Sequence, residues 1–146
     1  MSPLFKPLPA FSPAVQSKCQ CRLMSEWRKS ITVTNVWSNA VFWVEEQFLK
    51  RKFCAVGEIG IDLYWDTSTL EIQKNAFRHQ IQLAKKYKLP IVIHCRDAFN
   101  EVFEVLEEEK GDDLFGIFHC FTGTFEQAQK AISYNMKLGI GGVVTF

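Results

Sequence analysis

Four apolar segments alternate with amphipathic segments from residue 53 onward, and this alternation limits the folds open to the chain. The apolar segments are rich in β-branched residues and apolar at consecutive positions, which is typical of strands buried on both faces. They occupy residues 53–62, 89–95, 114–120 and 137–142. The order predicts an α/β fold in which parallel strands are joined by right-handed helical connections.

Each of the first three predicted strands is followed by a segment with helical periodicity. Two of these segments begin with a capping-box pattern, in which Ser or Thr precedes Glu or Gln by three residues. The patterns are Ser68 with Glu71 and Thr124 with Gln127. Apolar residues three or four positions apart are expected to face the sheet. They are Leu70, Phe77, Ile81 and Ala84 in the first helix, Phe99, Val102, Phe103 and Leu106 in the second, and Ala128, Ala131 and Ile132 in the third.

The length of the chain restricts this pattern to part of a barrel. A complete TIM-type (β/α)8 barrel needs about 250 residues, whereas this chain has 146. About four parallel βα units therefore predict a partial TIM-type barrel over residues 41–146. Residues 1–40 contain four of the five prolines and an excess of basic residues, and we expect them to form an irregular extension. Within and beside it, residues 31–37 alternate as a short strand and residues 38–50 have helical periodicity.

Charge and cysteine content narrow the function classes. A net charge of +1 gives no general attraction to nucleic acid or to membranes, and no apolar run approaches the roughly 20 residues of a membrane span. The five cysteines are odd in number and lie largely in apolar runs, which favours reduced thiols over a disulfide framework. We therefore expect a cytoplasmic protein with no membrane partner, although the basic N-terminal segment leaves an organellar transit peptide open.

Three residues with metal-ligating side chains fall where predicted strands end. They are Glu58, His94 and His119, separated by 36 residues (94 minus 58) and 25 residues (119 minus 94). Functional residues of parallel sheets gather at the carboxyl ends of the strands, and adjacent strands lie about 5 Å apart. A single histidine there is commonly a hydrogen-bonded structural residue, and Glu58 alone suits a salt bridge. The three together favour a site for Zn²⁺, Mn²⁺ or Fe²⁺ more than for Mg²⁺. His79, in contrast, lies among polar residues and is expected to be solvated.

Four stretches of the chain resemble signature motifs of the TatD-type metal-dependent deoxyribonucleases. They are residues 56–64 (VGEIGIDLY), 89–98 (LPIVIHCRDA), 116–123 (GIFHCFTG) and 138–146 (LGIGGVVTF), and the resemblance covers roughly residues 45–146. It implies divalent-metal-dependent hydrolysis of DNA phosphodiester bonds. It also implies that Glu58, His94 and His119 are metal ligands, with Glu58 in the catalytic, metal-bridging position. Arg96 is a candidate phosphate-binding residue, with a structural ion pair as the alternative.

The chain also departs from the pattern of this family. The family begins with a His-x-His strand and has a later Glu-Thr-Asp motif with a ligating aspartate, but this chain has no histidine before His79 and ends before the later motif. The resemblance therefore implies one divalent ion (Zn, Mn or Mg) in place of the two in the complete family site, and impaired activity. The alternatives are a non-catalytic fragment, or a metal-dependent barrel hydrolase of small molecules. The expected partners are DNA and, through open sheet edges, a second copy of the chain.

Overall fold

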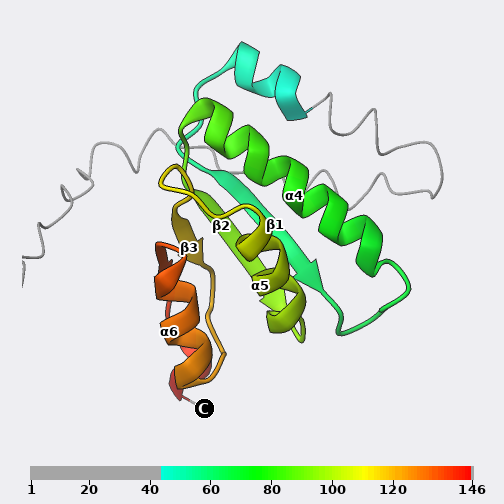
Figure 1. The fold of residues 1–146 in the computed structure, drawn as a ribbon, viewed down its shortest axis with the longest axis vertical. Coiled ribbons are helices and arrows are strands. Elements are labelled where there is room, and N and C mark those ends of the chain that lie inside the picture. The colour runs from blue at the N-terminus through cyan, green and yellow to red at the C-terminus, as the bar shows by residue number, and fades with distance from the viewer. Residues whose placement is uncertain (1–43, 146) are drawn as a thin grey trace, which may run out of the picture.

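Strands and helices alternate in the expected order in the computed structural model, which describes residues 44–145 (Figure 1). A helix over residues 44–50 precedes the first strand. The predicted strand 31–37, the start of the predicted helix 38–50 and the extension 1–40 lie outside the described residues. The elements that follow are β1 (Val56–Asp62), α4 (Leu70–Tyr87), β2 (Ile91–Arg96), α5 (Phe99–Glu108), β3 (Gly116–Phe118), α6 (Phe125–Ser133), β4 (Met136–Leu138) and the 3₁₀ helix η1 (Gly142–Thr145).

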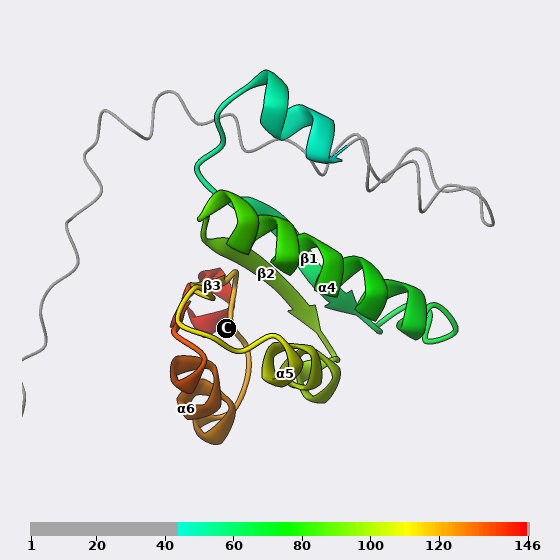
Figure 2. The ribbon, with the colours of Figure 1, turned by 45° about the horizontal axis from the view of Figure 1, so that its top comes forward.

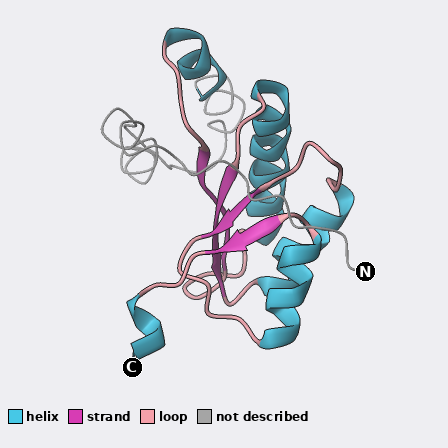
Figure 3. Cartoon of the chain, turned by 90° about the vertical axis from the view of Figure 1, so that its left-hand side faces the viewer, coloured by secondary structure: helices cyan, strands magenta, loops and turns pink. Residues whose placement is uncertain are grey.

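The four strands form one parallel sheet in the order β1-β2-β3-β4. The helices α4, α5 and α6 lie together on one side of this sheet, as Figures 2 and 3 show. We call the opposite side, which these helices leave uncovered, the inner face. Sequential parallel strands with helices on one side are the geometry of a (β/α)8 barrel, and the predicted partial barrel is confirmed.

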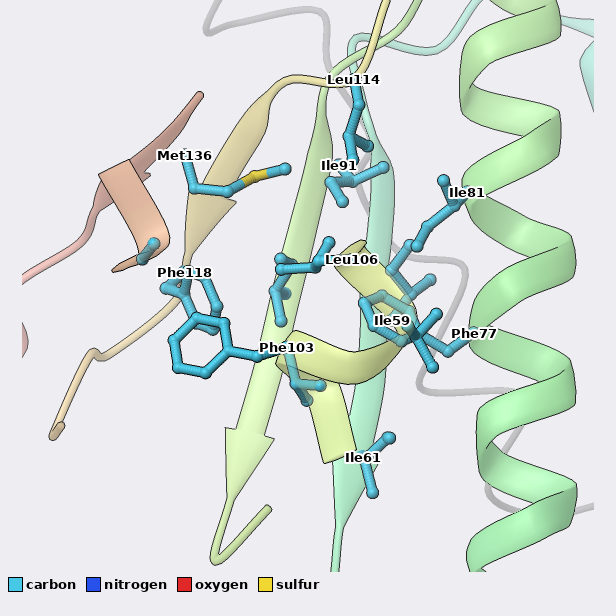
Figure 4. Close-up of a cluster of buried hydrophobic side chains, with 14 of the residues drawn as sticks. Ile59, Ile61, Phe77, Ile81, Ile91, Phe103, Leu106, Leu114, Phe118 and Met136 are labelled. Carbon is cyan, nitrogen blue, oxygen red and sulfur yellow. The ribbon is translucent and has the colours of Figure 1, made fainter. Parts of the chain in front are cut away.

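The hydrophobic core lies between the sheet and the helices (Figure 4). Alternate strand residues such as Ile91 and Ile93 point into it, and both are fully buried. Helix α4 contributes Phe77 and Ile81, and α5 contributes Leu106. Because side chains alternate along a strand, Val92 and His94, which flank Ile93 in β2, project from the inner face.

The two predicted capping boxes have different outcomes. Thr124 and Gln127 form a complete capping box at the start of α6. The prediction at Ser68 is wrong, because α4 begins at Leu70 and its N-cap residue makes no side-chain cap hydrogen bond. The Ser68 amide donates instead to Asp66 Oδ1 over 2.8 Å, and this local turn delays the start of the helix.

The predicted inner side of α6 is only partly correct. Ala131 is fully buried, but Ile132 is 59% exposed. Strands β3 and β4 each have only three residues, so the sheet beneath α6 is narrow. Ile140, Val143 and Val144 are also exposed, and the described structure therefore ends in an apolar surface beside β4.

Helices α4 and α5 are joined on their outer side by a seam of ion pairs. The pairs are Lys74–Glu104 at 2.7 Å, Arg78–Glu108 at 2.5 Å and Lys85–Glu109 at 3.3 Å. The Lys74–Glu104 and Arg78–Glu108 pairs each have one well-exposed member, so each of these two is expected to stabilise the fold by less than about 1 kcal/mol. The seam fixes the relative position of two helices that cover β1 and β2.

Two expectations about buried or reactive side chains need correction. His79 is not fully solvated: the residue is half-buried, and its Nε2 is buried with no hydrogen-bond partner within the described part of the chain. Cys54 is disulfide-bonded, which contradicts the expectation of reduced thiols. Cys95 and Cys120 are free, and burial raises the pKa of the Cys95 thiol to about 12.

No helix within residues 44–145 is long and apolar enough to cross a membrane.

Candidate metal centre

Glu58, His94 and His119 lie close to one level of the sheet, but not all at strand ends. The expectation that Glu58 and His94 close their strands is wrong, since β1 continues to Asp62 and β2 to Arg96. His119 directly follows β3, and its amide donates to the Ile93 carbonyl over 2.8 Å. Because β3 is short, its end lies beside the middle of β2.

A register shift in β1 sets the position of Glu58. Gly57 pairs with Val92 and Ile59 with Ile93, so Glu58 is the extra residue between them. Such a β-bulge redirects the side chain of the residue it contains. The Glu58 side chain extends past β2, and its Oε1 lies 2.7 Å from Nδ1 of His119, which follows β3. The sequence-predicted residues Glu58 and His119 are therefore brought together.

His94 has a different carboxylate partner, which was not among the site residues predicted from the sequence. Its Nε2 lies 3.0 Å from Oδ2 of Asp62. Gly60 is the strand neighbour of His94, and Asp62 is the neighbour of Arg96, so the imidazole and the carboxylate project from the same face of adjacent strands. Asp62 follows Gly60 by two residues in the sequence. This spacing indicates a contact with His94 only once the pairing of β1 with β2 is known.

Several groups hold the Asp62 carboxylate in place. The Tyr64 amide donates to Oδ1 over 3.0 Å. Partial burial acts to raise the pKa of Asp62, but the hydrogen bonds from His94 and the Tyr64 amide, with the nearby charges of His94 and Arg96, outweigh it and lower the pKa below its usual value. Asp62 is thus an ionised partner for His94 at neutral pH.

Gln73 in the first turns of α4 fixes the backbone at the end of β1. Its Oε1 accepts from the Asp62 amide over 2.8 Å, and its Nε2 donates to the Asp62 carbonyl over 3.0 Å. Leu63 extends the pairing, because its amide donates to the Arg96 carbonyl. Sequence reasoning missed Gln73, since nothing in its own helix distinguishes it from other polar residues.

Gly60 allows β1 and β2 to approach beside His94. Its φ is +139°, and a Cβ atom there would lie 2.0 Å from the His94 carbonyl oxygen. Only glycine adopts this conformation readily.

Arg96 is exposed at the end of β2. Its guanidinium carbon lies 3.7 Å from the centroid of the Tyr64 ring and 5.9 Å from that of Trp65. Within residues 44–145, the guanidinium makes no hydrogen bond or ion pair, so the structural ion pair considered for Arg96 is not formed there. Its role in phosphate binding stays a prediction.

The donor set suits a divalent cation chemically, while its arrangement is two pairs and not one cluster. Within the described residues, no three His, Cys, Asp or Glu side chains gather as a metal-holding group. Two ligands that each lie about 2.0–2.2 Å from one ion are roughly 3 Å apart, close to the 2.7 Å between Glu58 and His119. Glu58 is 40% exposed and His119 52%, so an ion can reach both.

A partial parallel barrel with imidazole and carboxylate groups on its inner face is typical of metal-dependent barrel hydrolases. The family model described as TatD related DNase matches residues 24–146. The chain belongs to the TatD related DNase family. The match begins upstream of residue 45, where the motif resemblance starts, so it includes part of the segment expected to be an extension.

Individual relatives agree with this assignment. The chain is 47% identical over 104 residues to the "Uncharacterized metal-dependent hydrolase YabD" of Bacillus subtilis, covering 71% of this chain and 41% of that protein. It is 43% identical over 91 residues to the "3'-5' ssDNA/RNA exonuclease TatD" of Salmonella typhimurium, covering 62% and 35%. The crystal structure of the TatD homologue YjjV from Escherichia coli superimposes with a TM-score of 0.69 at 31% identity, covering 75% of this chain and 42% of that one. The chain thus spans about two-fifths of the length of the relatives it matches.

Proposed function

We propose that this chain is a divalent-metal-dependent hydrolase that acts on DNA phosphodiester bonds. The observation that carries the proposal is the contact between Glu58 and His119 beside the His94–Asp62 pair on the inner face. Relatives named as metal-dependent hydrolases and as an exonuclease of single-stranded DNA and RNA support it.

Each site residue has a proposed role. Glu58, His94 and His119 would hold one ion, and three protein ligands are enough for an open catalytic site. An ion held there would supply Lewis-acid chemistry, which would lower the pKa of a water molecule and neutralise charge on a phosphate. Asp62 keeps the His94 ring oriented, as carboxylates do for ligating histidines. Arg96 would bind a phosphate oxygen through its unpaired N–H groups.

We propose that hydrolysis by this chain is weak. Two-metal phosphodiester hydrolysis needs ions about 3.5–4 Å apart, and the described residues offer side chains for one. The experiment is cleavage of single-stranded and duplex DNA with added Mn²⁺, Zn²⁺ or Mg²⁺, alongside Glu58→Ala. Glu71→Ala is the matched control, because Glu71 is an exposed glutamate of α4. Slow metal-dependent cleavage that Glu58→Ala abolishes and Glu71→Ala retains is expected.

Other outcomes of this experiment are equally informative. Cleavage that persists in Glu58→Ala would indicate a contaminating nuclease. Rapid turnover lost in Glu58→Ala would contradict the proposed impairment. No cleavage together with no metal uptake by elemental analysis would favour the non-catalytic fragment.

We further propose that the chain self-associates. Strands β1 and β4 are the edges of the described sheet, and unpaired edges of parallel strands favour pairing with another chain. The exposed Ile132, Ile140, Val143 and Val144 lie on the β4 side. Sedimentation should detect a dimer or larger species at micromolar concentration, and a stable monomer there would contradict the proposal.

A cytoplasmic location is proposed as well, and the state of Cys54 tests it. Disulfides are rare in the cytosol, so a cytoplasmic protein should have a reduced Cys54, whereas the structure has it disulfide-bonded. Alkylation of thiols in freshly lysed cells, followed by mass spectrometry, would show whether Cys54 is reduced or disulfide-bonded in the cell.

A further inference from the structure

Tyr64, Trp65 and Arg96 form an exposed surface, here called the aromatic platform, directly beside the site. The rings of Tyr64 and Trp65 are 4.5 Å apart at 88°, and the Arg96 guanidinium stacks on Tyr64 at 3.7 Å. Tyr64 is 51% exposed and Trp65 82%. A large aromatic ring left in water at this extent marks a binding surface more often than a packing element.

Contacts within the chain place this platform next to the candidate metal centre. The Tyr64 amide donates to Asp62 Oδ1, whose other oxygen contacts His94. Arg96 is two residues beyond His94 on β2, and its side chain leaves from the same face. A turn in which Asp66 accepts from the Ser68 amide follows Trp65 directly. The platform is therefore anchored on both sides and not carried by a free loop.

The chemistry of the platform suits a nucleotide. The Trp65 indole offers an open face, and aromatic faces bind unpaired bases of any sequence by stacking. The Arg96 guanidinium lies over the Tyr64 ring and its N–H groups have no partner within residues 44–145, so they are free to bind a phosphate. The guanidinium and the Trp65 ring are 5.9 Å apart, a separation that one nucleotide can bridge with its base on the indole and its phosphate on the guanidinium.

We propose that the aromatic platform binds an unpaired nucleotide of single-stranded nucleic acid, with the base on Trp65 and the phosphate on Arg96. This inference deepens the proposed function, on which it rests for its biological meaning. A base in a duplex is covered on both faces by its neighbours, so the platform selects single strands or frayed ends over duplex. It would hold the strand beside Glu58 and His119 whether or not an ion is bound.

The test is binding of a fluorescently labelled oligo-dT of six nucleotides to the full chain in EDTA, measured by anisotropy. Trp65→Ala should weaken binding about 5- to 160-fold, the range for loss of one stacked base. Trp65→Phe should restore most of the affinity, because phenylalanine retains an aromatic face. Phe125→Ala is the matched control, since Phe125 is also exposed, at 73%, but lies at the start of α6. Circular dichroism would verify that each variant is folded.

Salt dependence tests the phosphate contact separately. Arg96→Gln should reduce the slope of log affinity against log salt by about 0.7, as expected for one phosphate contact on a single strand. Arg96→Lys should keep the slope, because it keeps the charge.

Absence of wild-type binding, tighter binding to a duplex of the same length, or equal affinity for wild type and Trp65→Ala would overturn the inference. These measurements contain no metal and no cleavage step. Binding that depends on Trp65 in a chain that hydrolyses nothing would therefore reject the proposed hydrolase alone.

Discussion

The two imidazole–carboxylate pairs on the inner face differ in how firmly the surrounding chain holds them. Asp62 of the His94 pair accepts a backbone amide, has its own backbone fixed by Gln73, and is only 28% exposed. Glu58 of the His119 pair is 40% exposed and lies at a bulge. The first pair is therefore suited to orienting an imidazole, whereas the second has donors that an incoming ion can bind with little rearrangement.

The largest expected effect comes from breaking the strand contact beneath the first pair. Gly60→Ala should lower the free energy of unfolding by at least about 3 kcal/mol, because the new Cβ would meet the His94 carbonyl at a φ that alanine avoids. Urea unfolding would measure it. Gly142→Ala is the control, since a Cβ there meets nothing within 4 Å. Equal stabilities for the two variants would show that β1 and β2 are not so closely paired.

The second pair should dominate metal affinity. Glu58→Ala removes a direct ligand, so the affinity for Zn²⁺ or Mn²⁺ should fall by more than about 100-fold, beyond the loss typical of residues that only orient ligands. Isothermal titration calorimetry on chelator-treated protein would measure it, with Glu71→Ala as the control. An affinity unchanged in Glu58→Ala would remove Glu58 from the site.

The first pair should have a smaller effect on the same titration. Asp62→Asn leaves every proposed ligand in place but weakens the orientation of His94, so metal affinity should fall about 10- to 100-fold. If Asp62→Asn were as damaging as Glu58→Ala, Asp62 would be a ligand itself, and the contrast between the two pairs would disappear.

Acid should weaken the stabilising contribution of Asp62. The pKa of Asp62 is lowered in the folded chain, so its stabilisation is present above the ordinary carboxyl pKa of 3.8 and is lost as pH falls through the lower folded value. In metal-free protein, the stability difference between wild type and Asp62→Asn should shrink as the pH falls below 3.8. Urea midpoints across this range would measure it, and a difference that grows in acid would contradict the assigned direction.

The smallest effect is expected outside both pairs. Arg78→Gln removes the ion pair with Glu108 on the outer side of α4 and should change the free energy of unfolding by less than about 1 kcal/mol. Metal affinity should stay as in wild type. A loss of metal affinity in this variant would mean that the helix seam transmits strain to the inner face, so that effects in the other variants were not local.

The fold was largely predictable from the sequence because its signals are local. Apolar runs and helical periodicity located every described strand and helix from Val56 to Leu138. The lengths of β3 and β4 were not predictable, since the apolar run 114–120 continues past Phe118 while the chain turns at Cys120, whose φ is +48°. Capping depends on which of two competing hydrogen bonds forms, and Ser68 illustrates this: its amide bonds to Asp66 and α4 starts later.

The candidate site was only partly predictable because contacts between strands depend on register. Glu58 and His119 were selected from the sequence, and the structure brings them together. The bulge that directs Glu58 toward β3 has no local sequence signal, and the pairing of His94 with Asp62 needs the alignment of Gly60 with His94. Gln73 belongs to α4 but hydrogen-bonds to the backbone of Asp62 in β1. The helical periodicity of the sequence does not indicate such a contact between two elements.

The separation of the two faces of the sheet has a consequence for how variants of this protein can be interpreted. The helix-covered side contains the fully buried residues, whereas the side chains of Glu58, Asp62, His94 and His119 are each at least 28% exposed. Replacing any of these four leaves no cavity in the core, so a loss of function should come without a loss of solubility or expression yield. Variants found in genomes can be sorted on this basis: changes at positions such as Phe77 or Ile93 should reduce the amount of protein, and changes on the inner face should reduce what each molecule can do.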